Sequence, residues 1–101
     1  MVYQVYYAVM PTGEILQCDD FKSLYYFAKS HLLGEFDEFE SETVNVILYK
    51  GIYVEWDTGT TRHCCHYPLR SIATMSAFRT IYGDIDYTVL HHDVSYLHRE
   101  V

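Results

Sequence analysis

The chain has 101 residues, half of them hydrophobic and 17% aromatic, with 14 acidic side chains against 7 Lys and Arg and a formal net charge of −7. This length fits one domain, and the apolar fraction excludes wholesale disorder. No stretch approaches the roughly 20 apolar residues that span a bilayer, and the first residues have no secretory-signal pattern. Three cysteines make no disulfide framework, which favours the cytoplasm.

Charge is distributed unevenly along the chain. Residues 1–57 hold ten acids and three bases, whereas residues 58–101 hold four of each. Residues 35–42 alone contain five carboxylates and two phenylalanines, and five of the six histidines lie in the second part. The sequence therefore predicts an acidic end and a neutral, histidine-rich end. The acidic excess argues against nucleic acid as a direct partner, because phosphate binding needs clustered Lys and Arg.

The beginning of the chain predicts a strand, a short hairpin and a helix. Residues 2–9 are rich in Val and Tyr on both alternate faces, which predicts a central strand. A turn at 11–14 leads into a short returning segment at 14–18. Asp19 or Asp20 can cap the helix, which Gly34 would end. Its apolar stripe comprises Phe21, Leu24, Tyr25, Ala28, His31 and Leu32.

The rest of the chain predicts three more strands and a second helix. Strands are expected at 43–49 and 52–56, with a tight hairpin between them at Lys50-Gly51. Residues 62–67 are ambiguous between a strand and an irregular crossover. Pro68 suits the first turn of a helix that Gly83 would end, before a final strand at 85–90. The stripe of this helix comprises Ile72, Met75, Phe78, Ile81 and Tyr82.

This order of elements predicts an α+β fold, the ferredoxin-like split βαβ sandwich. Two helices would cover one face of an antiparallel sheet of four to five strands, with the first and third strands central. The main alternative is a more β-rich α+β arrangement in which 62–67 forms an extra strand.

The second half of the chain contains His63-Cys64-Cys65-His66, whose side chains are of the types that bind zinc. On a strand, neighbouring residues point to opposite faces, so at most two of the four share one ion. Further ligands would have to come from Cys18, His91 or His92. No CxxC pair is present, so we predict neither a metal nor a cofactor. A small metal- or nucleotide-binding enzyme built on this half is the alternative function.

Tyrosines are frequent on the expected strands, where Tyr3, Tyr7, Tyr49, Tyr53 and Tyr87 occur. Some of them must face the side of the sheet that the helices leave open. Tyr and Trp give large, rigid contact areas, which favours contact with another protein. That other protein could be a second copy of the chain, which would cover the open face of the sheet in a homodimer.

The acidic segment 35–42 carries the preferred functional hypothesis. Phe36 and Phe39 can anchor this segment to the core, so that its carboxylates project from a fixed surface. The acids at the end of the expected strand 52–56 can join the same surface. The expected contacts are Glu35, Asp37, Glu38, Glu40, Glu42, Glu55 and Asp57, with Tyr53 and Trp56 as apolar anchors. Fixed carboxylates imitate a phosphate backbone and would attract a basic groove.

We therefore expect a small non-enzymatic protein that binds and inhibits a basic partner, a nucleic-acid-binding enzyme or complex, by mimicking nucleic acid. No membrane contact is expected. By class-level analogy alone, such compact acidic chains resemble phage-encoded anti-defence proteins, including anti-CRISPR and antirestriction mimics, although no motif identifies a family.

Overall fold

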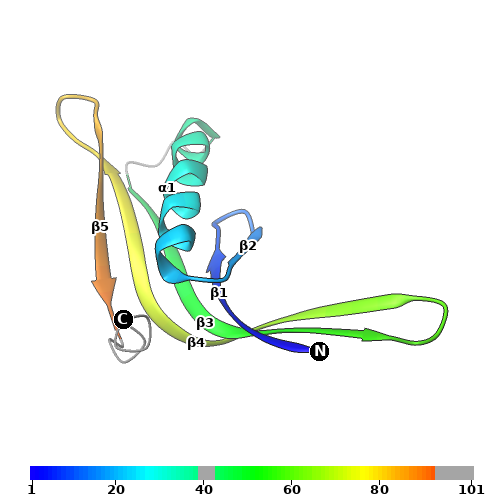
Figure 1. Ribbon diagram of the computed structural model, residues 1–101. Helices are drawn as coiled ribbons and strands as arrows, with labels where there is room; N and C mark the ends of the chain where they lie inside the picture. The colour runs from blue at the N-terminus through cyan, green and yellow to red at the C-terminus, as the bar shows by residue number, and fades with distance from the viewer. Residues whose placement is uncertain (39–42, 93–101) are drawn as a thin grey trace.

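The computed structural model describes residues 1–38 and 43–92, and their side chains outside 33–38. Its elements are β1 (Val2–Val9), β2 (Ile15–Cys18), α1 (Phe21–Glu38), β3 (Thr43–Asp57), β4 (Arg62–Arg79) and β5 (Ile85–His91). The strands form one antiparallel sheet in the order β2-β1-β3-β4-β5. The sheet curls, and α1 packs on one of its faces (Figure 1). As the sequence predicts, β1 is an inner strand.

The ferredoxin-like sandwich is wrong, because a strand takes the place of the expected second helix. Residues 68–79 belong to β4, which is paired with β3 along its length and with β5 over residues 73–79. Pro68 lies where no described strand pairs with the second edge of β4, because β5 pairs only with residues 73–79, and proline within a sheet is typical of such edges. Residues 62–67 are also strand. Among the described residues, α1 is the one helix.

The core lies between α1 and the middle of the sheet. Leu24, Ala28 and Leu32 of α1 are fully buried, and they repeat at the helical spacing that the sequence predicts. Alternate residues of the strands face them, and these are Tyr6, Ala8, Val44, Val46, Leu48, Ala73, Met75 and Ala77. Gly34 does not end the helix, which continues to Glu38. Within the described part of the chain, no helix is both long and apolar enough to cross a membrane.

The sheet bends where β4 carries two extra residues. The pairing of β3 with β4 shifts at Ile72 and again at Leu69, and such bulges bend a strand and increase its twist. Gly51 lies at the bend, where a Cβ would stand 2.0 Å from the carbonyl oxygen of Tyr67. Only glycine permits this approach. The expected hairpin at Lys50-Gly51 is therefore wrong: β3 runs through both residues without a turn.

Beyond the bend, β3 and β4 continue as a narrow hairpin that projects from the body (Figure 1). We call residues 52–67 the arm; its turn lies at residues 58–61. The molecule measures 56 × 33 × 17 Å, and its radius of gyration of 15.4 Å exceeds the roughly 13 Å of a compact domain of this length. The arm accounts for much of this elongation.

Candidate protein-binding arm

The arm exposes both of its faces over most of its length. Among residues 1–38 and 43–92, its one paired neighbour is the start of β1, where Val2, Tyr3 and Gln4 lie opposite Val54, Tyr53 and Ile52. No residue of the arm reaches the burial of the core, and α1 does not cover it. Four of the sequence-predicted contacts, Tyr53, Glu55, Trp56 and Asp57, lie together here.

One face of the arm carries a row of aromatic rings across three strands. Tyr3 of β1 lies opposite Tyr53 of β3, which in turn lies opposite His66 of β4. The rings of Tyr3 and Tyr53 stack with centroids 6.0 Å apart, and those of Tyr53 and His66 are 5.2 Å apart. We call these three residues the ladder. Because directly paired residues share a face, the register alone explains this alignment.

Tyr7 joins the ladder to the body of the protein. This buried residue of β1 donates a hydrogen bond from its hydroxyl to the carbonyl of Ile52 over 2.8 Å. Its ring also meets the ring of His66 edge to face, at 5.5 Å between centroids. Burial raises the pKa of the Tyr7 hydroxyl, so this group stays a neutral donor. The base of the arm is therefore fixed on the core.

Trp56 lies near the turn, on the opposite face to the ladder. It pairs with His63 across the hairpin and stacks on it at 5.3 Å and 17°. Its side chain is nevertheless 44% exposed. Together with Met1, Glu55, Asp57 and Arg62, it lines a hollow of about 200 Å³. The exposed face of the indole ring is suited to contact with a cationic side chain.

The two acids of the arm are held differently. Glu55 accepts a hydrogen bond from the Tyr53 hydroxyl over 2.9 Å, and this bond, with Cys64 nearby, raises the pKa of Tyr53. Asp57 lies 3.8 Å from Arg62 in an ion pair whose side chains are both more than 70% exposed. Such an exposed pair is weak, so Asp57 can exchange Arg62 for another cation at little cost.

The structure does not bring all the predicted acids into one patch. Glu35, Asp37 and Glu38 lie on the last turns of α1, at the opposite end of β3 from Glu55 and Asp57. Figure 1 shows that end of α1 far from the turn of the arm. The remaining two predicted contacts, Glu40 and Glu42, lie outside the described residues.

The cysteines and histidines of the arm alternate between its faces, as expected for a strand. Cys64 pairs with Glu55 and Cys65 with Val54, so the adjacent thiols point to opposite sides. In the described ranges 1–38 and 43–92, no three His, Cys, Asp or Glu side chains are placed to hold a metal ion. Burial, with Asp20 and Asp19 nearby, raises the pKa of the Cys18 thiol, which disfavours its reactive thiolate.

Sequence reasoning missed Tyr3 and His66 as parts of the same site as Tyr53. Their alternation with neighbouring residues is visible in the sequence, but their alignment depends on the register of three strands. No family model, curated protein or solved structure matches this chain. The site must therefore be interpreted from its own geometry.

Proposed function

We propose that this chain is a non-enzymatic binding protein that inhibits a basic, nucleic-acid-binding partner protein, and that the arm is its main contact surface. The observation that carries this proposal is the projection of exposed aromatic and acidic side chains on a hairpin that the rest of the described chain leaves open. The arm would enter the cleft in which the partner binds nucleic acid and so compete with it.

The aromatic residues support a binding role for the arm. Trp and Tyr dominate the energetics of protein interfaces because they bury much area with few rotatable bonds. On the arm they are already ordered, since the rings of the ladder contact one another and Trp56 is stacked on His63. A surface that is fixed before binding loses less entropy on association.

The acids support a basic partner. Asp57, held by the exposed ion pair with Arg62, can bind a Lys or Arg side chain of the partner instead, and the exposed ring of Trp56 can receive another cation on the other face of the arm. The net charge of −7 would speed the encounter with a basic surface, and the acids of α1 would add to the attraction at a distance. Contact with α1 itself requires a partner that extends well beyond the arm.

The test begins with capture of partners from the source cells by the immobilised chain. The captured protein is then titrated with the wild type and with a Glu55→Gln/Asp57→Asn variant over a salt series, in competition with its labelled nucleic acid. We expect displacement of the nucleic acid, and about tenfold weaker binding of the variant at low salt. The matched control is Asp84→Asn/Asp86→Asn, which removes two exposed acids at the other hairpin and should bind as the wild type does.

Two results would contradict the proposal. One is a captured protein that binds the chain and its nucleic acid simultaneously. The other is a stable dimer by light scattering in which the ladder is protected, because a second copy would then cover the surface offered to a partner.

A further inference from the structure

A groove runs along the outer edge of β2, which is an edge strand of the sheet. Its volume is about 230 Å³, and it is lined by Ile15, Leu16, Gln17 and Cys18 of β2 with Phe27 and His31 of α1. Neighbouring residues of a strand point to opposite faces, so a hollow lined by four in succession lies beside the strand and not on one face. We propose that this groove, which we call the β2 groove, binds an extended basic segment of another protein, which joins the sheet as a strand beside β2.

The edge of β2 offers backbone hydrogen bonds to such a segment. β2 pairs with β1 on one side, and no strand in the described part of the chain pairs with its other side. The N–H of Met10 donates to the carbonyl of Glu14 over 2.8 Å, and bonded pairs recur at every second position of an antiparallel ladder. By this alternation the N–H and C=O groups of Ile15 and Gln17 point outward, away from β1. An added strand can pair with these four groups, as peptides do at the open sheet edges of other binding domains.

The helix supplies the far wall of the β2 groove. Phe27 and His31 are four residues apart and therefore lie on one face of α1, and the ring of Phe27 is 57% exposed. Leu16 of β2 points to the side of α1, where it packs against the core. In antiparallel pairing, the segment residue opposite Leu16 points to that same side. An apolar side chain at this position would therefore contact both Leu16 and Phe27.

Acidic residues at both ends of β2 favour a segment with basic residues. Glu14 directly precedes the strand, and one of its carboxylate oxygens lies 3.9 Å from Nδ1 of His31. Both side chains are well exposed, so this pair is weak and Glu14 can bind a Lys or Arg of the segment instead. Asp19, which directly follows the strand, is also exposed. Lys or Arg side chains opposite these two acids would each form a cross-strand pair of opposite charge.

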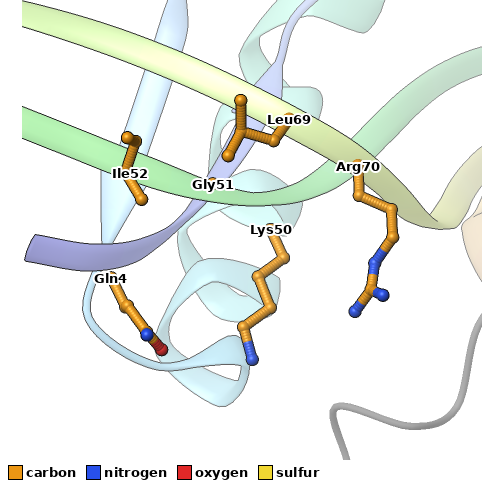
Figure 2. Close-up of a pocket in the computed structure, with 6 residues that line it drawn as sticks. All are labelled: Gln4, Lys50, Gly51, Ile52, Leu69 and Arg70. Atoms are coloured by element: carbon orange, nitrogen blue, oxygen red, sulfur yellow. The ribbon is translucent and has the colours of Figure 1, made fainter.

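A larger hollow, of about 310 Å³, lies at the bend and has a different geometry. Figure 2 shows the side chains of Gln4, Lys50 and Arg70 leaving neighbouring strands on the same side. This hollow therefore lies across a face of the sheet, whereas an added strand must pair with an edge. The bend is accordingly not expected to bind the segment, and its amides serve as an internal reference.

The experiment titrates the full ¹⁵N-labelled chain with the capped peptide Lys-Val-Thr-Leu-Thr-Lys. In the antiparallel register, the Leu of the peptide lies opposite Leu16, and its first and last Lys lie opposite Asp19 and Glu14. The titration requires no partner of the arm, so it can fail or succeed independently of the function proposed above.

The backbone amide resonances report the position of the peptide. We expect saturable shifts centred on Ile15 and Gln17, slower hydrogen exchange of these two amides, and little change at Gly51. N-methylation of the first Thr, which lies opposite Gln17, should abolish binding because it removes a donor to the edge of β2. N-methylation of the peptide Leu, whose N–H points away from β2, is the matched control and should be tolerated.

Two variants of α1 test the wall of the groove. Phe27→Ala should weaken binding of the peptide about tenfold. Tyr26→Ala should bind as the wild type does, because Tyr26 is equally exposed, at 57%, but does not line the groove. Absent or unsaturable shifts, equal losses in the two variants, or equal binding of the two methylated peptides would overturn the proposal. Shifts of Ile15 and Gln17 that depend on the concentration of the free chain would overturn it too, because a second copy would then occupy the edge.

Discussion

The Nδ1 atom of His66 lies 3.3 Å from the hydroxyl oxygen of Tyr7, although 59 residues separate them in the sequence. The single proton of that hydroxyl is directed to the carbonyl of Ile52, which can only accept. The Tyr7 oxygen is therefore left as an acceptor toward His66. It follows that Nδ1 of His66 carries a proton, whether or not Nε2 does.

We predict that neutral His66 adopts the Nδ1–H tautomer. Long-range ¹H–¹⁵N correlation spectra of the imidazole at high pH should show Nδ1 protonated and Nε2 bare. In Tyr7→Phe this constraint is lost, and the carbonyl of Ile52 loses its hydroxyl donor. We expect a mixture of tautomers in that variant and a loss of about 1–2 kcal/mol in the free energy of unfolding. A protonated Nε2 in neutral wild-type His66 would contradict this interpretation.

Gly51→Ala should be strongly destabilising. The added methyl group would stand 2.0 Å from the carbonyl oxygen of Tyr67, so the two strands must separate at the bend. We expect a loss of about 3 kcal/mol in urea denaturation. Gly59→Ala is the matched control: Gly59 has a φ of +91° but nothing near its Cβ position, so only backbone strain of about 1 kcal/mol is expected. Equal losses in both variants would show that the close approach at Gly51 has no energetic importance.

Asp20 should stabilise the start of α1 in a pH-dependent way. Its carboxylate accepts from the backbone N–H and the hydroxyl of Ser23, at 2.7 and 3.0 Å, and these bonds lower its pKa. A lowered pKa in the folded state means that the charge stabilises the protein above the ordinary value of 3.8 and that this contribution disappears as pH falls through the lowered pKa.

Thermal unfolding between pH 2 and 7 measures this effect. Asp20→Ala should have a lower Tm than the wild type at pH 7, whereas Asp20→Asn, which keeps a capping oxygen, should recover most of the difference. The remaining gap between Asp20→Asn and the wild type should close below pH 3.8. A gap that widened in acid would be inconsistent with this cap.

The two parts of β3 should differ in local stability. Residues 43–49 pack against the core, whereas residues 52–57 belong to the arm and have no side chain of comparable burial. Amide hydrogen exchange should therefore be about 100-fold faster in the second part than in the first. Equal protection along β3 would mean that the arm is as stable as the body, which its exposure does not explain.

The sequence predicts the elements whose pattern is local. The strand at 2–9, the short returning segment that forms β2, the start of α1 and the final strand are all found within a residue or two of their expected places. In each case, alternation, a helical stripe or a turn residue lies within a few residues of the boundary. The same holds for Glu55, Trp56 and Asp57, which lie on one strand end and stay together in the structure.

The prediction of a second helix is wrong because a bulge in β4 gives its buried residues the spacing of a helix. Ile72 is an extra residue of β4, so Ile72 and Ala73 are both buried before alternation resumes at Met75. Ile72 and Met75 then lie three residues apart, as on a helix. The division of the predicted acidic patch has a related cause. Gly51 lies at a bend within β3 and not in a turn between two strands. The strand therefore carries Glu55 and Asp57 away from α1 instead of folding back toward it.

The most direct test of the arm as the binding surface is the equilibrium affinity of the captured basic partner for Trp56→Ala and Tyr82→Ala. Both residues are exposed aromatics near hairpin turns, with Tyr82 85% exposed at the turn between β4 and β5. We predict that Trp56→Ala weakens binding by about 30-fold or more, while Tyr82→Ala changes it less than about twofold. Equal affinities of the two variants, or a larger loss with Tyr82→Ala, would contradict the arm as the contact surface.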